Sequence, residues 1–434
     1  MVKNKIVRRT YIRLKGELAT PLLAGSGENI HTDMDVLRDF YGTPFIAGTA
    51  IAGAFRDWLE SISTADQQAI GEESIHSLFG AKNTDESDFR QSRIFISDLQ
   101  LDCQRVIKTR DHVKLSDKIA YKTGKFDVEV IETGTPFTMY LEYIERNSSK
   151  ADKDKQMVHA LISAMSNGEL TLGGRTNRGY GKLAITEVRE KEFLYTSPKE
   201  VQKWLDWSRD KFERAQDITH TLSKYTILEK IEVPLTIKYT LLIRDYKTMD
   251  DLDYTFLRAN NQPVIPGSTW AGAFRQRLED IIIQVTGKKQ EHDIVEELFG
   301  CKHGDNHATP SILQFEESVV TDSAPLTRTR NAIDRFSGAT IDGTLFTGES
   351  VCKGQTSLII RWRKQGVRKS SVISDDAIKG ILNWLIQDLA GGLLAIGGET
   401  SVGRGIFELI EKPIQTIDKP EFAKAAIDYI CGGK

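Results

Sequence analysis

Cysteine is scarce in this sequence, and no two cysteines lie close together. Four occur in 434 residues, at Cys103, Cys301, Cys352 and Cys431. This spacing provides neither a disulfide framework nor paired Cys-x-x-Cys metal motifs, so a small secreted fold held by disulfides is excluded. We therefore expect a reducing environment and a cytoplasmic location.

Long apolar runs and a large net charge are also missing. No segment approaches the roughly 20 apolar residues of a membrane-spanning helix, so we expect no membrane partner. The basic N-terminal segment MVKNKIVRRTYIRLKGELA alternates like a strand and lacks the continuous apolar core of a signal peptide. The 58 Lys and Arg residues and 61 Asp and Glu residues give a net charge of −3. A generic polyanion binder would be more basic. A local basic groove is still compatible with this net charge, because the net charge sums over all faces of the protein.

The sequence does contain an internal repeat. Residues 44–62, PFIAGTAIAGAFRDWLESI, and residues 263–281, PVIPGSTWAGAFRQRLEDI, are identical at eleven of nineteen positions. Five further pairs follow in the same order: LFG and LFG, SRIFISD and PSILQFEES, KTRDHVKL and RTRNAIDR, TPFTMYLEYI and GQTSLIIRW, and LGGRTNRGYGKL and IGGETSVGRGIF. The third of these pairs aligns Arg110 with Arg330. Such self-similarity predicts two copies of one domain, at residues 1–222 and 223–434.

Each copy predicts the same order of elements. An opening strand, at residues 7–18 or 232–243, leads to a helix whose N-cap we assign to Thr49 or Ser268. A strand, a long polar hairpin, another strand, a second helix and a last strand follow. This α+β order is ferredoxin-like, and its antiparallel sheet can leave one face open for a ligand. Between the copies, SPKEVQKWLDWSRDKFERA predicts one amphipathic connecting helix that completes the first domain.

These segments resemble the RAMP superfamily, and within it the backbone subunits of type III CRISPR effector complexes. The resemblance rests on VLRD…PFIAGTAIAGAFR and FLRA…PVIPGSTWAGAFR, on RNAIDRFSGAT…LFTGE, and on the loops GGRTNRGYG and GGETSVGRG, and it covers nearly the whole chain twice. The fusion of two copies resembles type III-D systems. The resemblance implies an α+β fold of two tandem ferredoxin-like (RRM-like) RAMP domains with thumb-like insertions, here residues 107–125 and 326–340.

The same resemblance implies a function in antiviral defence. Such subunits work in a ribonucleoprotein, bind guide crRNA and other CRISPR effector subunits, and act as endoribonucleases that cut complementary target RNA at regular intervals. In the family, an aspartate five positions before the motif arginine carries out the cut. Asp33 stands five positions before Arg38, and Asp253 stands five before Arg258. The resemblance therefore implies one cleavage site in each half.

RNA cleavage by this route needs little from the protein. The ribose 2′-oxygen can act as the nucleophile, so the protein has to hold the phosphate and stabilise charge. A carboxylate with a pKa of about 4 is a poor base at neutral pH but a good ligand for Mg²⁺ or Mn²⁺. We therefore expect Asp33 and Asp253 to act through an RNA-bound divalent ion.

Neighbouring carboxylates leave an alternative open. Asp35 and Asp39 in the first loop, or Asp250 and Asp251 in the second, are the ligands if the loop register differs. Acidic residues in polar loops also commonly cap turns, without any catalytic role.

Basic side chains, glycines and helix starts supply the candidate RNA contacts. Free N–H groups at a helix start suit phosphates, and glycines let RNA approach the backbone closely. The thumbs combine basic residues with apolar tips that can wedge between bases. The alternatives are tight packing for the glycines and mobile surface hairpins for the thumbs. The RNA-binding candidates are Arg38, Gly48, Thr49, Arg56, Arg110, Lys114, Arg175, Arg178, Arg258, Gly267, Ser268, Thr269, Arg275, Arg328, Arg330, Arg335 and Arg404.

One cluster lies outside the repeat. Cys301, His303 and His307, in CKHGDNHA, offer three ligands of the four that a structural Zn²⁺ site requires. Two alternatives to target cleavage also stay open at this point. One is a crRNA-binding scaffold that does not cut, and the other is an endoribonuclease that processes precursor crRNA and commonly relies on histidine.

Overall fold

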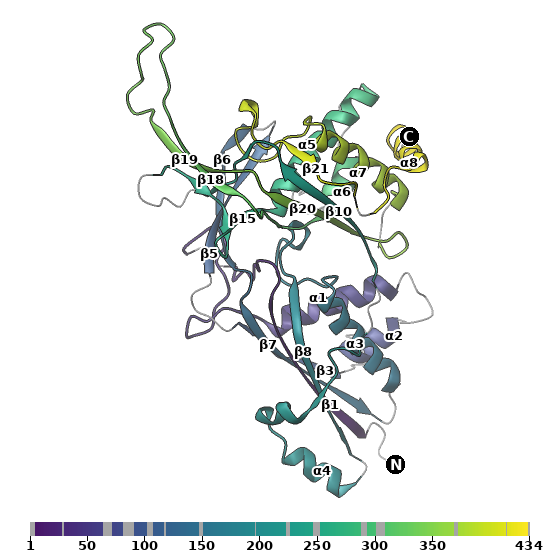
Figure 1. Ribbon diagram of the computed structural model, residues 1–434. Coiled ribbons are helices and arrows are strands. Elements are labelled where there is room, and N and C mark those ends of the chain that lie inside the picture. The colour runs from purple at the N-terminus through teal and green to yellow at the C-terminus, as the bar shows by residue number, and fades with distance from the viewer. Residues whose placement is uncertain are drawn as a thin grey trace.

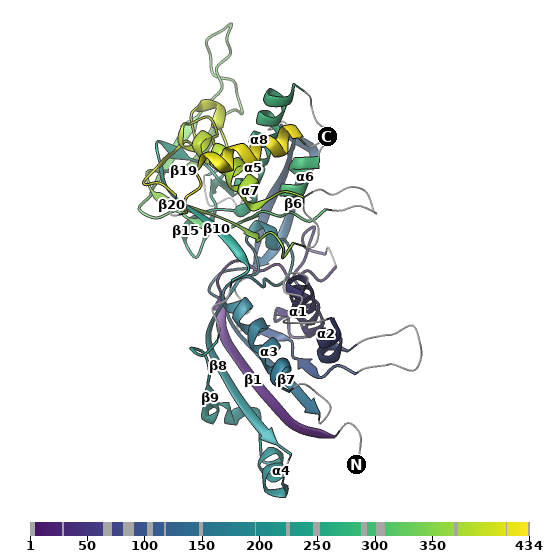
Figure 2. The same ribbon diagram turned by 90° about the vertical axis from the view of Figure 1, so that its right-hand side faces the viewer.

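The protein consists of two α+β halves that follow one another along the molecule (Figures 1 and 2). Each half buries its own hydrophobic core. The mixed α+β class is therefore as expected. The computed structural model describes residues 5–27, 30–63, 72–80, 91–101, 107–116, 119–146, 151–195, 197–222, 226–245, 252–287, 293–300, 309–368, 372–413 and 415–432.

The first half is built on one sheet with the strand order β2-β4-β7-β1-β8-β9, and β3 also pairs with β7. The central strand β1 pairs antiparallel with both β7 and β8. Helices α1, α2 and α3 cover one face of this sheet (Figure 2). The elements are β1 (Ile6–Leu18), β2 (Phe45–Ile46), α1 (Gly48–Ser63), α2 (Glu72–Phe79), β3 (Ile94–Ile96), β4 (Leu99–Leu101), β5 (Ile107–Ser116), β6 (Ile119–Ile131), β7 (Pro136–Arg146), α3 (Ala151–Ser166), η1 (Thr176–Arg178) and β8 (Leu183–Leu194), followed by α4 (Pro198–Leu205), η2 (Arg209–Arg214) and β9 (Gln216–Asp217).

The second half repeats this plan, with the sheet order β16-β20-β10-β21 and antiparallel pairs throughout. Strand β10 takes the central place of β1, between the counterparts of β7 and β8. The elements are β10 (Leu228–Ile237), β11 (Thr240–Leu241), β12 (Arg244–Asp245), β13 (Thr255–Phe256), β14 (Arg258–Ala259), β15 (Gln262–Ile265), α5 (Gly267–Thr286), α6 (Asp293–Phe299), β16 (Gln314–Phe315), β17 (Ser318–Val319), β18 (Ala324–Arg330), β19 (Phe346–Cys352), β20 (Gln355–Arg363), α7 (Asp375–Ala390), η3 (Thr400–Val402), β21 (Phe407–Leu409) and α8 (Pro420–Gly432).

The prediction that Thr49 and Ser268 are N-caps is wrong. Helices α1 and α5 already begin at Gly48 and Gly267, and the N-cap of α5 is Pro266, which makes no side-chain bond. A Cβ at these glycines would lie 2.4 and 2.1 Å from a carbonyl oxygen of the neighbouring strand. The helix therefore starts one residue early because only glycine lets its first turn pack this close to the sheet.

The connecting segment is not one helix. Helix α4 starts after Ser197, whose side chain accepts a hydrogen bond from the N–H of Glu200, and it ends at Leu205. A separate 3₁₀ helix, η2, then buries Phe212. Of the apolar residues in this segment, Trp204 and Phe212 contact the first half, whereas Leu205 is 61% exposed. The helical path is interrupted between Asp206 and Ser208.

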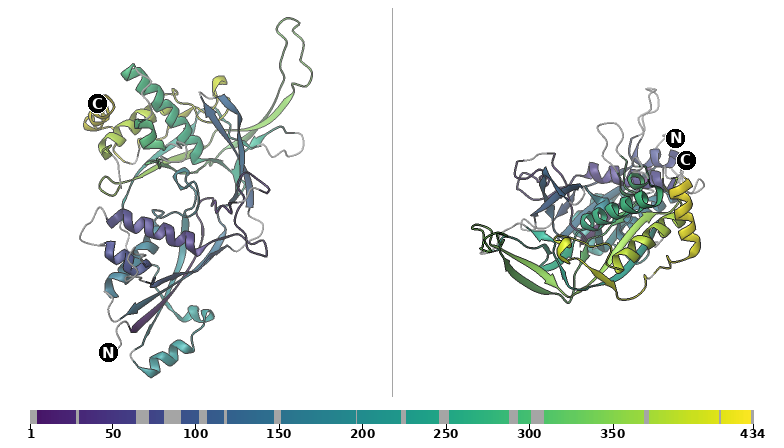
Figure 3. Two further views of the ribbon diagram at one scale, coloured as in Figure 1. Left: turned by 180° about the vertical axis from the view of Figure 1, so that it is seen from behind. Right: turned by 90° about the horizontal axis from the view of Figure 1, so that it is seen from above.

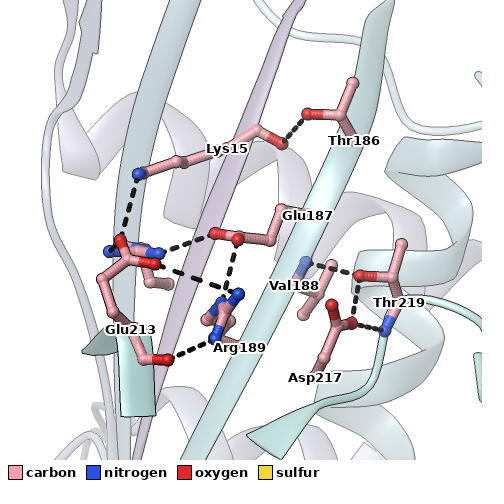
Figure 4. Close-up of polar contacts among 9 residues, drawn as sticks. Lys15, Thr186, Glu187, Val188, Arg189, Glu213, Asp217 and Thr219 are labelled. Carbon is pink, nitrogen blue, oxygen red and sulfur yellow. Dashed lines mark hydrogen bonds and ion pairs between the residues drawn. The ribbon is translucent and has the colours of Figure 1, made fainter. Parts of the chain in front are cut away.

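This segment covers the sheet face that we expected to be open in the first half. Ile12 and Leu14 face the helices, so the alternate residues of β1 face the other side. There, Trp204 Nε1 donates to the Tyr11 hydroxyl at 2.9 Å. Glu213 lies against Lys15 and Arg189 of the sheet (Figure 4). The expectation of an open ligand-binding face is therefore wrong for this half.

The thumb-like insertions are two hairpins. Strands β5 and β6 form the first, and strands β18 and β19, joined by residues 331–345, form the second. The second hairpin projects far from the body (Figures 1 and 3). We use "thumb" for these two hairpins below.

The strand register corrects one detail of the repeat. Arg110 lies opposite Val128, one position before Glu129, and Arg328 lies opposite Gly348, one position before Glu349. Arg110 therefore corresponds to Arg328, and not to Arg330. The segment RTR contains two arginines, and only the pairing with the partner strand distinguishes them.

Candidate RNA-binding and cleavage site

Asp33 and Asp253 occupy equivalent exposed positions, each in a loop beside its thumb. The Asp33 carboxylate accepts the N–H of Asp127 at 3.0 Å, and its own N–H donates to the Asp127 carboxylate at 3.1 Å. The Asp253 carboxylate accepts the N–H of Thr347 at 2.7 Å, and its own N–H donates to the Thr347 carbonyl at 2.8 Å. In both halves the partner lies 94 residues downstream. The structure thus brings both aspartates to the second strand of a thumb.

No sequence pattern points to Asp127. It lies beside Asp33 only because of the register of β6, and its counterpart in the second half is Thr347. The first half therefore offers two adjacent carboxylates and the second offers one. Among the described residues, no group of three His, Cys, Asp or Glu side chains is placed to hold a metal ion. Any divalent ion at these loops would need oxygen ligands from RNA.

The alternative carboxylates of the first loop have other partners. Asp35 is 4% exposed and accepts hydrogen bonds from the N–H groups of Ile30, His31 and Thr32. Burial by itself would raise the pKa of Asp35, but these hydrogen bonds lower it well below its usual value. Asp39 accepts two N–H groups of its own turn at 2.9 and 2.8 Å. Both carboxylates therefore cap turns.

The motif arginines anchor the loops. Arg38 binds Glu129 at 2.8 Å, and Arg258 binds Glu349 at 2.9 Å. Both glutamates lie on the second strand of the thumb. RNA contact by Arg38 and Arg258 stays a prediction. In the structure, these two arginines hold each loop against its thumb.

The two helix starts differ in what covers them. The N–H of Gly48 donates to the carboxylate of Asp98 at 2.8 Å, while Thr49 is exposed. Gly267 is buried, and a Cβ there would lie 2.4 Å from the carbonyl oxygen of Arg178, in the glycine-rich loop of the first half. The start of α5, with half-exposed Ser268 and Thr269, therefore lies directly beside that loop.

Two further candidates on these helices bind their own helix. Arg56 pairs with Glu60 at 2.9 Å, and Arg275 pairs with Glu279 at 3.2 Å. Arg275 also donates to the carbonyl of Gly300 at 3.0 Å. Both guanidinium groups are partly exposed, so these pairs leave room for a phosphate.

The glycine-rich loop of the first half carries positive charge without a balancing carboxylate. Within the described part of the chain, neither Arg175 nor Arg178 forms an ion pair with an acidic side chain. Burial lowers the pKa of both, and nearby Arg175 and Arg275 lower that of Arg178 further. Burial, together with the positive charges of Arg175, Arg110 and Arg178, lowers the pKa of His112 to about 3. An anion at this place would relieve the repulsion, and the start of α5 adds N–H groups to the same site.

The equivalent loop of the second half contains a carboxylate that its arginines share. Glu399 stands where the first half has Arg175, and it binds Arg244 at 3.1 Å, Arg330 at 2.8 Å and Arg404 at 2.9 Å. Arg404 is only 4% exposed. Its burial disfavours the predicted RNA contact, and the two loops are unequal in their charge partners.

Arg110 has a different place from the one we expected. It is 3% exposed and forms ion pairs with Glu132 of the first half and Glu317 of the second. The guanidinium therefore joins the two halves instead of facing solvent. Its counterpart Arg328 is exposed on the second thumb, as is Arg335. Phe336, an apolar residue between the two strands of this thumb, is fully exposed.

Some predictions fall outside the described residues. Nothing is described of the candidate zinc ligands Cys301, His303 and His307, of the side chain of Lys114, or of Asp250 and Asp251. These stay predictions.

Comparison with known proteins identifies the family. The model of the RAMP superfamily matches residues 15–184 and 235–408, one region in each half. No curated protein sequence matched the chain. In the described residues, no helix combines the length and apolar character needed to cross a bilayer. Members of this superfamily are CRISPR-associated RNA-binding subunits that generally work in ribonucleoprotein complexes. With a matched region in each half, the chain belongs to the RAMP superfamily as a tandem member.

Proposed function

We propose that this chain is a fused backbone subunit of a type III CRISPR effector, of the III-D kind. It binds guide crRNA and cuts complementary target RNA once in each half. One observation carries the proposal: Asp33 and Asp253 are exposed in the same hydrogen-bonded frame, 94 residues before their partners on the thumb. A scaffold that does not cut would have no need to keep this frame twice.

The RNA-binding part of the proposal rests on the joint between the halves, where the glycine-rich loop of the first half meets the start of α5. Arg175 and Arg178 supply charge without carboxylate partners among the described residues, and the start of α5 supplies N–H groups beside them. This combination suits the phosphates of a single-stranded guide. The sheet order β16-β20-β10-β21, with β10 in the centre, supports the ferredoxin-like assignment of each domain.

The chemistry divides between the RNA and the protein. The 2′-oxygen of the target supplies the nucleophile, and the thumb holds the flanking backbone so that attack can be in line. A divalent ion, when bound by Asp33 or Asp253 together with RNA oxygens, would stabilise the charge that develops on the phosphate. Asp127 adds a second carboxylate in the first half only.

The competing functions have weaker support. Processing of precursor crRNA by a histidine would point to His112, but a pKa of about 3 makes that imidazole a weak base and removes its acidic imidazolium form near pH 7. A scaffold that does not cut is favoured by one observation, namely the single carboxylate in the second half.

The deciding experiment maps cuts on one target. The complex is assembled with crRNA and partner subunits, end-labelled complementary RNA and Mg²⁺ are added, and Asp33→Ala, Asp253→Ala and the double variant are compared. Each single variant should lose one distinct cut and keep target affinity. Asp206→Ala, at the exposed end of α4, is the matched control. If the double variant keeps every cut, the chain is a scaffold.

A further inference from the structure

Two glutamates on the second strands of the thumbs hold the two candidate cleavage loops. We propose that Glu129 and Glu349 are positioning residues, which fix Asp33 and Asp253 to the thumb so that thumb and carboxylate move as one unit. This inference rests on the proposed cleavage function. It adds that the position of the thumb on the RNA sets the position of the carboxylate.

In the first half, Glu129 binds the part of the loop that follows Asp33. Its N–H donates to the carbonyl of Met34 at 3.0 Å, and its carboxylate accepts the N–H of Val36 at 2.9 Å. Both carboxylate oxygens accept from Arg38 at 2.8 Å. Glu129 is 7% exposed, so its charge depends on these partners. One side chain thus binds the loop on the C-terminal side of Asp33.

The strand itself holds the other side of the loop. Asp127 lies two residues before Glu129 on β6, and residues two apart in a strand point to the same face. The N–H of Asp127 binds the Asp33 carboxylate at 3.0 Å. The candidate catalytic oxygen is therefore attached to the same strand as the glutamate.

The second half repeats the arrangement with two hydrogen bonds fewer. The N–H of Glu349 donates to the carbonyl of Tyr254 at 3.1 Å, and its carboxylate binds Arg258 at 2.9 Å. Thr347, two residues earlier, donates its N–H to Asp253. The glutamate–arginine separation is 91 residues in both halves. Because Glu349 holds no counterpart of the Val36 N–H, we expect its removal to have the smaller effect.

The test uses each half as the standard for the other. Glu129→Gln and Glu349→Gln are assembled with crRNA and an end-labelled complementary RNA, and single-turnover rates of both cuts are measured. Because a displacement of about 1 Å can cost about 100-fold, we expect Glu129→Gln to slow the first-half cut about 10- to 100-fold. The second-half cut and the target affinity should not change. Glu349→Gln should slow only the other cut, and by less.

Glu145→Gln is the matched control. Glu145 is also buried, at 1% exposed, and it pairs with an arginine, Arg8, at 3.3 Å, but it lies on β7 away from the loop. It should slow neither cut selectively. A second readout is amide hydrogen exchange, in which Glu129→Gln should speed exchange at Val36 and Asp127 and Glu145→Gln should not.

Two results would overturn the inference. One is a first-half cut within threefold of wild type in Glu129→Gln, while Asp33→Ala removes that cut. The other is unchanged exchange at Val36 and Asp127, which decides the matter even if the chain proves not to cut RNA. If Asp33→Ala and Asp253→Ala leave every cut intact but exchange responds, the proposed function fails while Glu129 still positions the loop.

Discussion

Lys182 of the first half forms a buried ion pair with Glu316 of the second half. Only 7% of Lys182 is exposed, and Arg361 binds the same glutamate at 2.5 Å. Burial and the neighbouring Arg361 lower the pKa of Lys182 to about 8, although Glu316 opposes the shift. One carboxylate therefore balances two cations at the joint between the halves, and the joint carries a cost when Lys182 is charged.

The free-energy cost of burying charged Lys182 predicts that the stability of the protein depends on pH. The unfolded chain keeps the Lys182 proton up to about pH 10.5, whereas the folded chain releases it near pH 8. Between these values the unfolded state binds more protons, so stability rises with pH. The quantity to compare is the free energy of unfolding of wild type minus that of Lys182→Met. We expect this difference to rise by up to about 3 kcal/mol between pH 8 and pH 10.5. Below pH 8, Lys182→Met should be at least as stable as wild type.

Denaturant unfolding of both chains at several pH values measures this difference. Groups other than Lys182 titrate in both chains and cancel in the subtraction. A difference that stays flat from pH 8 to 10.5 would show that Lys182 keeps an ordinary pKa at the joint.

Removal of Arg110 should lower the free energy of unfolding, in contrast to removal of Lys182 below pH 8. Glu132 and Glu317 are 1% and 6% exposed at their side chains, and Arg110→Met leaves both carboxylates buried without this cation. Breaking a buried pair in this way costs about 3–5 kcal/mol. Arg56→Ala is the control, because its pair with Glu60 is about 40% exposed and such pairs contribute about 0–1 kcal/mol. Equal losses for the two variants in chemical unfolding would contradict the role of Arg110 at the joint.

The arginines of the first glycine-rich loop should set the salt dependence of crRNA binding. Each phosphate contact on a single strand contributes about 0.7 to the slope of log affinity against log salt. We expect Arg175→Ala with Arg178→Val to weaken crRNA binding and to reduce this slope by about 1.4. Arg178→Val copies Val402 of the second half. Filter binding at several salt concentrations measures the slope, and exposed Arg214→Ala should leave it unchanged.

The unequal partners of the two candidate aspartates predict unequal metal requirements. Asp127 stands beside Asp33, whereas Thr347 stands beside Asp253. Carboxylate count tunes the affinity for hard cations. Under the proposed function, the first-half cut should need less Mg²⁺ than the second-half cut, and Asp127→Thr should raise its requirement severalfold.

A titration of Mg²⁺ with both cuts resolved on one RNA tests this. Thr347→Asp is the reciprocal variant and should lower the requirement of the second cut only. If both variants leave the two titrations superimposed, Asp127 does not bind the ion.

The repeat itself determined much of what the structure contains. The AGAF segments, the glycine-rich loops and the five-residue spacing of Asp33 to Arg38 and of Asp253 to Arg258 are local patterns, and local patterns survive in sequence. They predicted two α+β halves, two thumbs and two equivalent aspartates. The helix starts at Gly48 and Gly267 were not predictable from local pattern, because the close approach of the sheet exists only once the strands are in place.

Tertiary structure alone decided where the charges go. Arg110 meets Glu317 207 residues away, and Asp33 meets Asp127 94 residues away. Arg178 and Arg404 lie in the two glycine-rich loops, and the fold places different groups beside them: the first lacks a carboxylate partner in the described chain, while the second is buried against Glu399. Sequence determines which side chains are charged, whereas burial and partners, set by strand register and by the packing of the two halves, determine which of them can bind RNA.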